Sequence, residues 1–194
     1  MKRNIKIVMR VFCCLLLAFL CISFLSQCSL MYSDKKNLSS DNLSYYNHTI
    51  FRSCFAGNYT WPSEEEYAEL DIPDECEGYR VTSLGGYIGS GGPCPFMVQM
   101  PDTRSIYSEG TLPDNAKIEQ YYLAINIGKH LRKVEIVEMK VYYNLGSNRF
   151  AQILVTVNCV PENPYFYSEN GKLYNRLDHS LVEEFFYYSD YSMN

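Results

Sequence analysis

The chain has 194 residues, of which 47% are hydrophobic and 15% aromatic, and this is enough for one domain with an apolar core. Four of its 17 basic residues lie in the first 28 positions, where no acidic residue occurs, so the remainder carries 13 basic against 22 acidic side chains, a formal charge of −9. Nucleic-acid phosphates require a basic surface, so this balance excludes a nucleic-acid-binding function. It suits a domain that is soluble outside the cell.

The N-terminus has the pattern of an export signal. Lys2, Arg3, Lys6 and Arg10 precede the uncharged run VFCCLLLAFLCISFL at residues 11–25. A basic segment followed by such a run is typical of a secretory signal peptide. The run has 15 residues, fewer than the roughly 20 that span a bilayer, although an uncleaved anchor is an alternative. We therefore assign residues 1–28 to a signal peptide, lipoprotein leader or anchor and expect an exported protein.

Cys28 is a candidate for lipidation. The segment Leu25-Ser26-Gln27-Cys28 resembles a bacterial lipobox, in which the cysteine is lipidated and becomes the mature N-terminus. Gln27 departs from this motif, because Gly, Ala or Ser is usual there. Plain secretion or anchoring without lipid is the alternative. Either route places the protein at the membrane, on the cell surface or in the medium.

Residues 29–49 have the composition of a polar spacer, with five Ser, three Asn and no long apolar periodicity. Such a segment buries too little apolar surface to fold, and we expect it to be disordered. The folded β-rich domain is accordingly predicted to span residues 50–194.

A spaced recurrence begins at Tyr67. Four partly alternating runs end at Ile72, Met100, Ile127 and Val155, in steps of 28, 27 and 28 residues. Alternation is typical of half-buried strands, and a fixed period in this range indicates a solenoid. We expect these four residues to form one ladder. Second apolar pieces would form the opposite wall of each coil: Val81 to Leu84, Ile106-Tyr107, Val134 to Ile136 and Leu173-Tyr174.

Two stretches resemble the repeat units of bacterial BspA-like leucine-rich repeat surface proteins. LDIPDECEGYRVTSLGGY, residues 70–87, is similar to their "IP…GY.VTSIG" unit, with Ile72-Pro73 at the strand end, Gly78-Tyr79 at the turn and Val81 in the second strand. The stretch 155–184 is similar to their repeat ends, where a strand precedes an Asn-Pro-aromatic segment. The resemblance implies short, degenerate leucine-rich-repeat-like coils. It also implies a non-enzymatic cell-surface protein that binds a partner protein or mediates adhesion.

A hairpin signal interrupts the coil pattern. Residues 133–143 and 149–159 are long alternating runs, separated by the turn-forming residues 144–148. We expect this hairpin as an insert between coils. The alternative is a small antiparallel β-sandwich, which would suit an exported accessory or inhibitor-like lipoprotein.

Four cysteines follow the leader and Cys28, at Cys54, Cys76, Cys94 and Cys159. Their spacing fits no zinc motif. Cys76 and Cys159 follow Ile72 and Val155 by four residues each, so a regular solenoid would place them at one coil position three steps apart. That separation is roughly 14 Å at sheet spacing, and disulfides need Cα atoms within about 7 Å. We therefore predict no bond between Cys76 and Cys159.

The sequence gives little support for catalysis. Asp178-His179-Ser180 has the letters of a hydrolytic triad, but adjacent residues do not converge as a triad must. An exported hydrolase would need His130 or His179 beside carboxylates in a pocket. Asn170-Gly171 favours a tight turn with positive φ over a cation site, because too few oxygens are present for calcium. We predict no enzyme activity, cofactor or metal.

Tyrosine is abundant, with 18 residues. Exposed tyrosine suits recognition because it combines an apolar ring with a hydroxyl and loses little entropy on binding. Two aromatic runs are the candidates for a binding surface or, alternatively, for a cap over the last coil: Tyr165, Phe166 and Tyr167, and Phe185, Phe186, Tyr187 and Tyr188.

Overall fold

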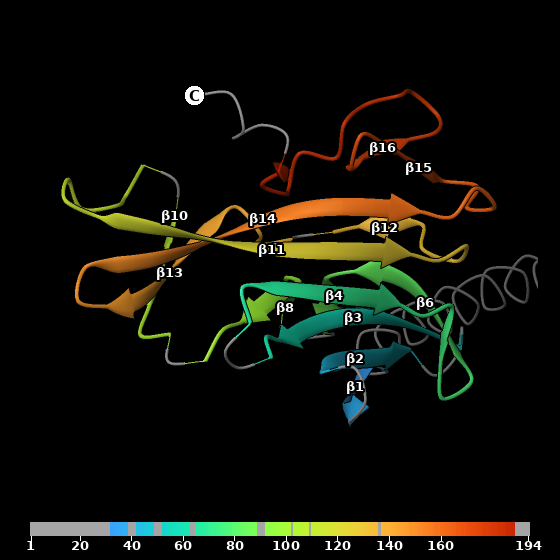
Figure 1. Ribbon diagram of the computed structural model, residues 1–194. Helices are drawn as coiled ribbons and strands as arrows, with labels where there is room; N and C mark the ends of the chain where they lie inside the picture. Colours follow the sequence, from blue (N-terminus) through green and yellow to red (C-terminus); the bar gives the residue numbers. More distant parts are fainter. Residues whose placement is uncertain are drawn as a thin grey trace, which may run out of the picture.

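The computed structural model describes residues 32–38, 42–48, 52–62, 65–88, 92–101, 103–108, 110–135 and 137–188. The fold is mainly β, as the sequence predicted, and no α-helix occurs in these ranges (Figure 1). Accordingly, none of the described segments is a helix that could cross a bilayer. Residues 1–28, including Cys28, lie outside the described ranges.

Two large sheets make up most of the described chain. One sheet has the order β1 (Tyr32–Leu38), β2 (Leu43–His48), β3 (Ser53–Thr60), β6 (Tyr79–Leu84), β12 (Lys133–Val134), with β5 (Glu75–Cys76) paired to β6 and β9 (Met97–Gln99) to β3. The other has the order β10 (Ile106–Ser108), β13 (Val141–Gly146), β14 (Arg149–Cys159), β11 (Lys117–Ile127), β4 (Tyr67–Ile72). We call them the seven-strand and five-strand sheets.

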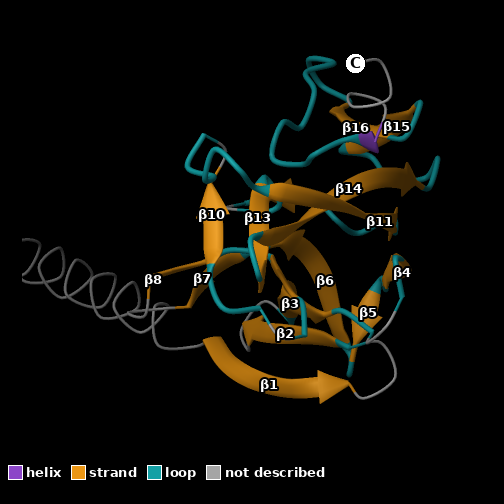
Figure 2. Cartoon of the chain, turned by 60° about the vertical axis from the view of Figure 1, so that its left-hand side comes forward, coloured by secondary structure: helices purple, strands orange, loops and turns teal. Residues whose placement is uncertain are grey.

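Two small hairpins complete the described strands: β7 (Gly86–Ile88) with β8 (Gly92–Cys94), and β15 (Phe166–Glu169) with β16 (Lys172–Asn175). The β15–β16 hairpin and the β1–β2 pair lie at opposite ends of the molecule (Figures 1 and 2).

Parallel pairing is the main feature of the five-strand sheet. β11 pairs in parallel with β4 on one side and with β14 on the other. The register places Ile72 beside Ile127, and Ile127 beside Cys159. In the seven-strand sheet, β6 pairs in parallel with β3 and β12. The chain thus passes from β4 to β6 and later from β11 to β12, each time from one sheet to the other.

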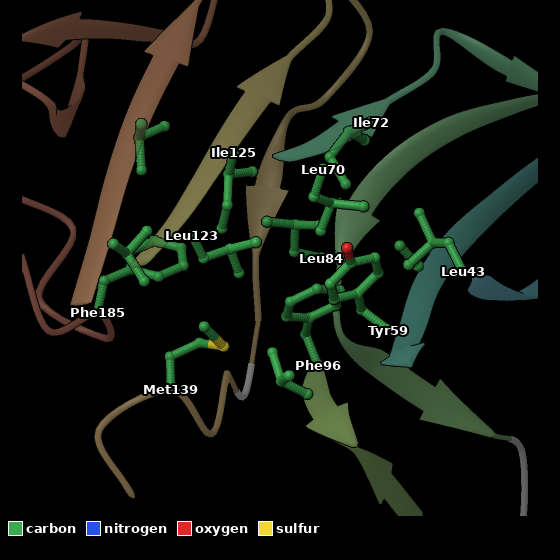
Figure 3. Close-up of a cluster of buried hydrophobic side chains, with 14 of the residues drawn as sticks. Leu43, Tyr59, Leu70, Ile72, Leu84, Phe96, Leu123, Ile125, Met139 and Phe185 are labelled. Atoms are coloured by element: carbon green, nitrogen blue, oxygen red, sulfur yellow. The ribbon is translucent and has the colours of Figure 1, made fainter. Parts of the chain in front are cut away.

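The core lies between the two sheets. β4 alternates exposed and buried residues, so Leu70 and Ile72 point inward. Leu123 and Ile125 of β11 meet Leu84 of β6 and other side chains of the seven-strand sheet (Figure 3). This common core explains why a strictly alternating run forms β4: one face meets apolar side chains and the other stays solvated.

β14 differs from β4 because both of its faces are covered. Its inward residues join the main core, while Phe150 and Leu154 pack on the outer face with Tyr142 and Phe186 in a second cluster. This explains its nearly continuous apolar sequence, which is the pattern of a strand buried on both faces.

The predicted period of 27–28 residues is wrong. β9, which precedes Met100, pairs with β3 in the seven-strand sheet and takes no part in the ladder. Val155 lies beside Leu123, four residues along β11 from Ile127. Of the four residues predicted to form one ladder, only Ile72 and Ile127 are neighbours, and they are 55 residues apart in the chain. The segments 81–84 and 133–134 do pair with each other, as expected for a shared second wall.

The hairpin is confirmed in its central part. β13 pairs antiparallel with β14, and Gly146 is opposite Arg149. Ser147 and Asn148 between them both have positive φ, 50° and 62°, which is the geometry of a type I′ turn. Lys133–Val134 instead joins the seven-strand sheet, so the first arm is shorter than expected. A sandwich that is antiparallel throughout is contradicted by the parallel pairing of β4, β11 and β14.

Residues 29–49 do not form a disordered spacer throughout. β1 and β2 form an antiparallel pair there, and β2 also pairs with β3. Leu43 and Tyr45 are fully buried in the main core. Leu43, Tyr45 and Asn47 alternate along β2 and give it one buried face, so the folded part begins before residue 50.

Candidate binding site at the strand ends

Three loops meet where β4, β11 and β14 end. The carboxyl ends of these parallel strands lie side by side, as their arrowheads show in Figure 1. In the loop after β4, Asp74 accepts a hydrogen bond from the backbone N–H of Lys129 at 2.8 Å, and its carboxylate lies 3.5 Å from the Lys129 ammonium. Gly128 permits this approach, because a Cβ there would lie 2.5 Å from the Asp74 carboxylate.

Asn163 joins the loop after β14 to the loop after β11. Its side chain is buried, with 1% exposure, and makes four hydrogen bonds. The amide N–H groups donate to the carbonyls of Gly128 (2.8 Å) and Leu131 (2.9 Å). The amide oxygen accepts from the backbone N–H groups of Tyr165 (2.8 Å) and Phe166 (2.9 Å). The Asn-Pro-aromatic segment therefore fixes the loops that surround the strand ends.

A row of polar side chains crosses the outer face of the same three strands. Asp71, Asn126 and Asn158 are register neighbours. The amide nitrogen of Asn126 donates to Asp71 Oδ1 and to Glu69 Oε1, both at 2.7 Å, and the amide oxygen of Asn126 accepts from Asn158 Nδ2 at 3.0 Å. These bonds hold three side chains from three strands in one line.

The polar row forms one wall of a cleft, which we call the strand-end cleft. Its volume is about 340 Å³, and its other lining residues are Ile72, Ile127, Gly128, Cys159 and Val160. An apolar concavity with a few convergent polar groups is the usual form of a ligand site, and ligand pockets span about 300–1,000 Å³. The cleft therefore has the size and lining of a small binding site.

Cys159 is suited to a structural role in this cleft. Burial raises the pKa of its thiol to about 11, while Arg176 opposes the shift. The thiol is therefore protonated at neutral pH and is a poor nucleophile. Cys159 is a free thiol whose Sγ lies 3.7 Å from the carbonyl oxygen of Phe166. Cys159 forms no disulfide with Cys76. We expected none from a regular coil spacing, but the structure does not have that spacing.

The predicted aromatic surface is largely interior. Phe166, Phe185, Phe186 and Tyr187 are each at most 3% exposed. The backbone of Tyr187 bridges to Val155 of β14, so the C-terminal segment covers part of a strand edge and not the last coil of a solenoid. These four residues are therefore wrong as binding-surface residues.

The remaining aromatic candidates are accessible but separate. Tyr165 is 48% exposed and Tyr188 is 46% exposed. Tyr167 is half-buried and stacks on Tyr174. Tyr188 instead contacts Tyr122, on the outer face of β11. These contacts belong to different elements and do not form a single aromatic patch.

The residues 178–180 do not form a triad. Ser180 donates directly to Asp178 through its hydroxyl at 2.7 Å, and His179 Nδ1 lies 3.2 Å from the Tyr167 hydroxyl. His130 is half-buried in the turn after β11. Within the ranges that the structure covers, no three potential metal ligands cluster together. Asn170 and Gly171 form the predicted tight turn, with φ of 52° and 75°.

The sequence analysis missed the strand-end cleft, although a signal for it was present. The last three residues of each strand are a polar residue between two apolar ones: Leu70-Asp71-Ile72, Ile125-Asn126-Ile127 and Val157-Asn158-Cys159. Three such triplets at the ends of strands predict three polar side chains on one outer face, provided that the strands are neighbours.

Searches against protein-family models, curated proteins and solved structures found no match for this chain.

Proposed function

We propose that this protein is an exported, non-enzymatic cell-surface protein, a short and degenerate leucine-rich-repeat-like module that binds its ligand in the strand-end cleft. The observation that carries the binding site is the convergence of Asp71, Asn126 and Asn158 from three parallel strands on one cleft. A site held by strands and tied loops is preorganised, which reduces the entropy lost on binding.

The repeat-like architecture has partial structural support. β4 ends at Ile72, the turn follows at Glu77 and Gly78 with φ of 47° and 78°, and β6 begins at Tyr79. These are the positions that the BspA-like unit implies. The parallel pairing of β4 with β11 and of β6 with β12 is what stacked coils require.

The leader supports export, and expression of the full chain in a bacterial host tests it. We expect the protein in the membrane or surface fraction, accessible to external protease. A Cys28→Ser variant that loses incorporated fatty acid would establish lipidation, whereas an unlipidated but exported wild-type chain would establish plain secretion or anchoring. A wild-type chain that stays in the cytoplasm would refute the proposal.

Binding is tested with the exported mature chain, purified and applied to arrays of immobilised extracellular proteins and polysaccharides. We expect at least one ligand whose binding is lost in the double variant Asp71→Ala/Asn158→Ala and kept in Tyr87→Ser. Tyr87 is a suitable control because it is 55% exposed on β7, away from the strand ends. Binding that is indifferent to the double variant would place the site elsewhere.

A further inference from the structure

The hydrogen-bonding groups of the strand-end cleft define what could bind there. The amide of Asn126 donates to Glu69 and Asp71, and its oxygen accepts from Asn158. Among the described contacts, Asn158 uses one N–H for Asn126, which leaves its second N–H and its amide oxygen for a ligand. The Asp71 carboxylate accepts from Asn126 through Oδ1 and has further acceptor capacity. A ligand that both donates and accepts hydrogen bonds, as a hydroxyl does, matches this edge.

The accessible apolar surface of the cleft comes from Val160, which is 37% exposed. Ile72 and Ile127 also line the cleft, but they are 4% and 1% exposed and their side chains belong to the main core. A suitable ligand therefore has a polar edge and an apolar face. A pyranose ring has this character, because its hydroxyls lie around the edge and its C–H groups lie on the faces.

The charges around the cleft favour an uncharged ligand. Glu69 and Asp71 are exposed carboxylates on β4, so they repel phosphate, sulfate or uronate groups. Two cations lie nearby: Lys129 is paired with Asp74, and the guanidinium of Arg176 donates to the carbonyls of Asn163 and Pro161. A basic peptide would satisfy the two carboxylates, but it would leave the amides of Asn126 and Asn158 and the apolar side without a specific role.

An aromatic ring lies farther along the same face. Tyr67 is 56% exposed, and it is on the same side of β4 as Glu69 and Asp71 because strand residues alternate. Four residues separate Tyr67 from Asp71, roughly 13 Å along a strand. A linear ligand seated in the cleft could therefore extend along β4 and stack on this ring.

From these four features we infer that the strand-end cleft binds one sugar unit of a neutral glycan, with the chain of the glycan lying along β4 towards Tyr67. This inference rests on the proposed function and narrows the ligand to a chemical class. Asp71 and Asn158 contact ring hydroxyls, Asn126 holds both of them in place, and Val160 contacts the C–H face.

Affinity electrophoresis of the exported mature chain tests this inference, in gels that contain mannan, laminarin, xylan or, as an anionic comparison, heparin. We expect at least one neutral polysaccharide to retard the wild type. Asp71→Ala and Asn158→Ala should each weaken that interaction about tenfold, because each removes a directional hydrogen bond. Tyr67→Ala should weaken it with long chains and leave the affinity for the free monosaccharide unchanged. Tyr87→Ser should match the wild type.

Thermal melting verifies that each variant is folded, and Asp71→Asn serves as the conservative second variant if Asp71→Ala unfolds. The inference is overturned if no neutral polysaccharide retards the protein, if retardation survives both cleft variants, or if only heparin or a polylysine probe binds. Cleft-dependent binding to an enzymatically deglycosylated protein would overturn the glycan inference and leave the proposed function standing. Binding that never depends on the cleft would overturn both.

Discussion

The buried amide of Asn163 offers the sharpest test of how the strand-end loops are held. Replacement by alanine removes four hydrogen bonds and leaves two carbonyls, of Gly128 and Leu131, and two N–H groups, of Tyr165 and Phe166, without their partner. The side chain is 1% exposed, so solvent does not replace these bonds without a rearrangement of the loops. At about 1 kcal/mol for each bond, the Asn163→Ala change should cost about 4 kcal/mol.

Urea denaturation followed by circular dichroism measures this cost. A loss of about 4 kcal/mol is a large part of the stability of a typical domain, about 5–15 kcal/mol. It corresponds to a fall in melting temperature of about 8–16 °C for a chain of this size. The matched control is Asn158→Ala, which removes one hydrogen bond from an exposed asparagine at the same end of the sheet and should cost less than about 1 kcal/mol.

An isosteric change adds a pH signature. In Asn163→Asp the carboxylate keeps the acceptors for Tyr165 and Phe166 but cannot donate to Gly128 and Leu131. Burial of the charge raises the pKa of such a carboxyl, so the variant should regain stability relative to wild type as the pH falls from 7 to 4. A cost of Asn163→Ala equal to that of the exposed control, or an Asn163→Asp penalty that is independent of pH, would refute this account of the loops.

Three further predictions concern the C-terminal segment, the thiol and the loop contact. Phe185→Ala should destabilise the fold by about 3–5 kcal/mol in urea titration, because Phe185 is 1% exposed. Tyr165→Ala, at an exposed position, should change the stability by less than about 0.5 kcal/mol. Equal effects would contradict a role of Phe185 in the C-terminal segment that covers β14. Because the pKa of Cys159 is raised to about 11, iodoacetamide at pH 8 should alkylate it at least about tenfold more slowly in the folded chain than in urea, as read by mass spectrometry of its peptide. The same shift means that folding favours the protonated thiol of Cys159. The stabilisation by this thiol is therefore present below about pH 9 and is lost as the pH rises towards 11. Above pH 9 the melting temperature should fall more steeply with pH in wild type than in Cys159→Ala. Gly128→Ala should lower the stability by about 1–3 kcal/mol, because its Cβ would lie 2.5 Å from the Asp74 carboxylate. Adding Asp74→Ala should recover part of that loss. Strictly additive losses of stability in the two variants would exclude this contact as the cause.

Local features followed from the sequence because they depend on neighbouring residues. Asn170-Gly171 has the positive φ values that its chemistry predicts. The hairpin turn also lies within the expected residues 144–148, although only Ser147 and Asn148 form it. The partial alternation of the run that ends at Ile72 predicted a half-buried strand, and β4 has one buried face. Each of these depends on the conformational preferences of a few adjacent residues or on the period of a single strand.

The sequence did not predict which strands pair with one another, for a physical reason. Alternation determines which face of a strand is buried, but a shift by two residues keeps the same face inward, so the pattern alone does not set register. The segment 73–116, between β4 and the 11-residue strand β11, contains strands of both sheets and the small hairpin of β7 and β8. Because of this long insertion, the two neighbours Ile72 and Ile127 are 55 residues apart, and no short sequence period relates them.

What the sequence determined by itself was the mainly β class of the fold, the acidic character and the tight turn at Asn170-Gly171. The export signal stays a prediction. Only the tertiary structure decided that β4, β11 and β14 lie side by side, and hence that Asp71, Asn126 and Asn158 share one cleft. It also placed Phe185 and Phe186 inside, because the open edge and outer face of β14 needed a cover that no local pattern specifies. Both outcomes depend on contacts between residues far apart in the chain, and these are set by the packing of the whole domain.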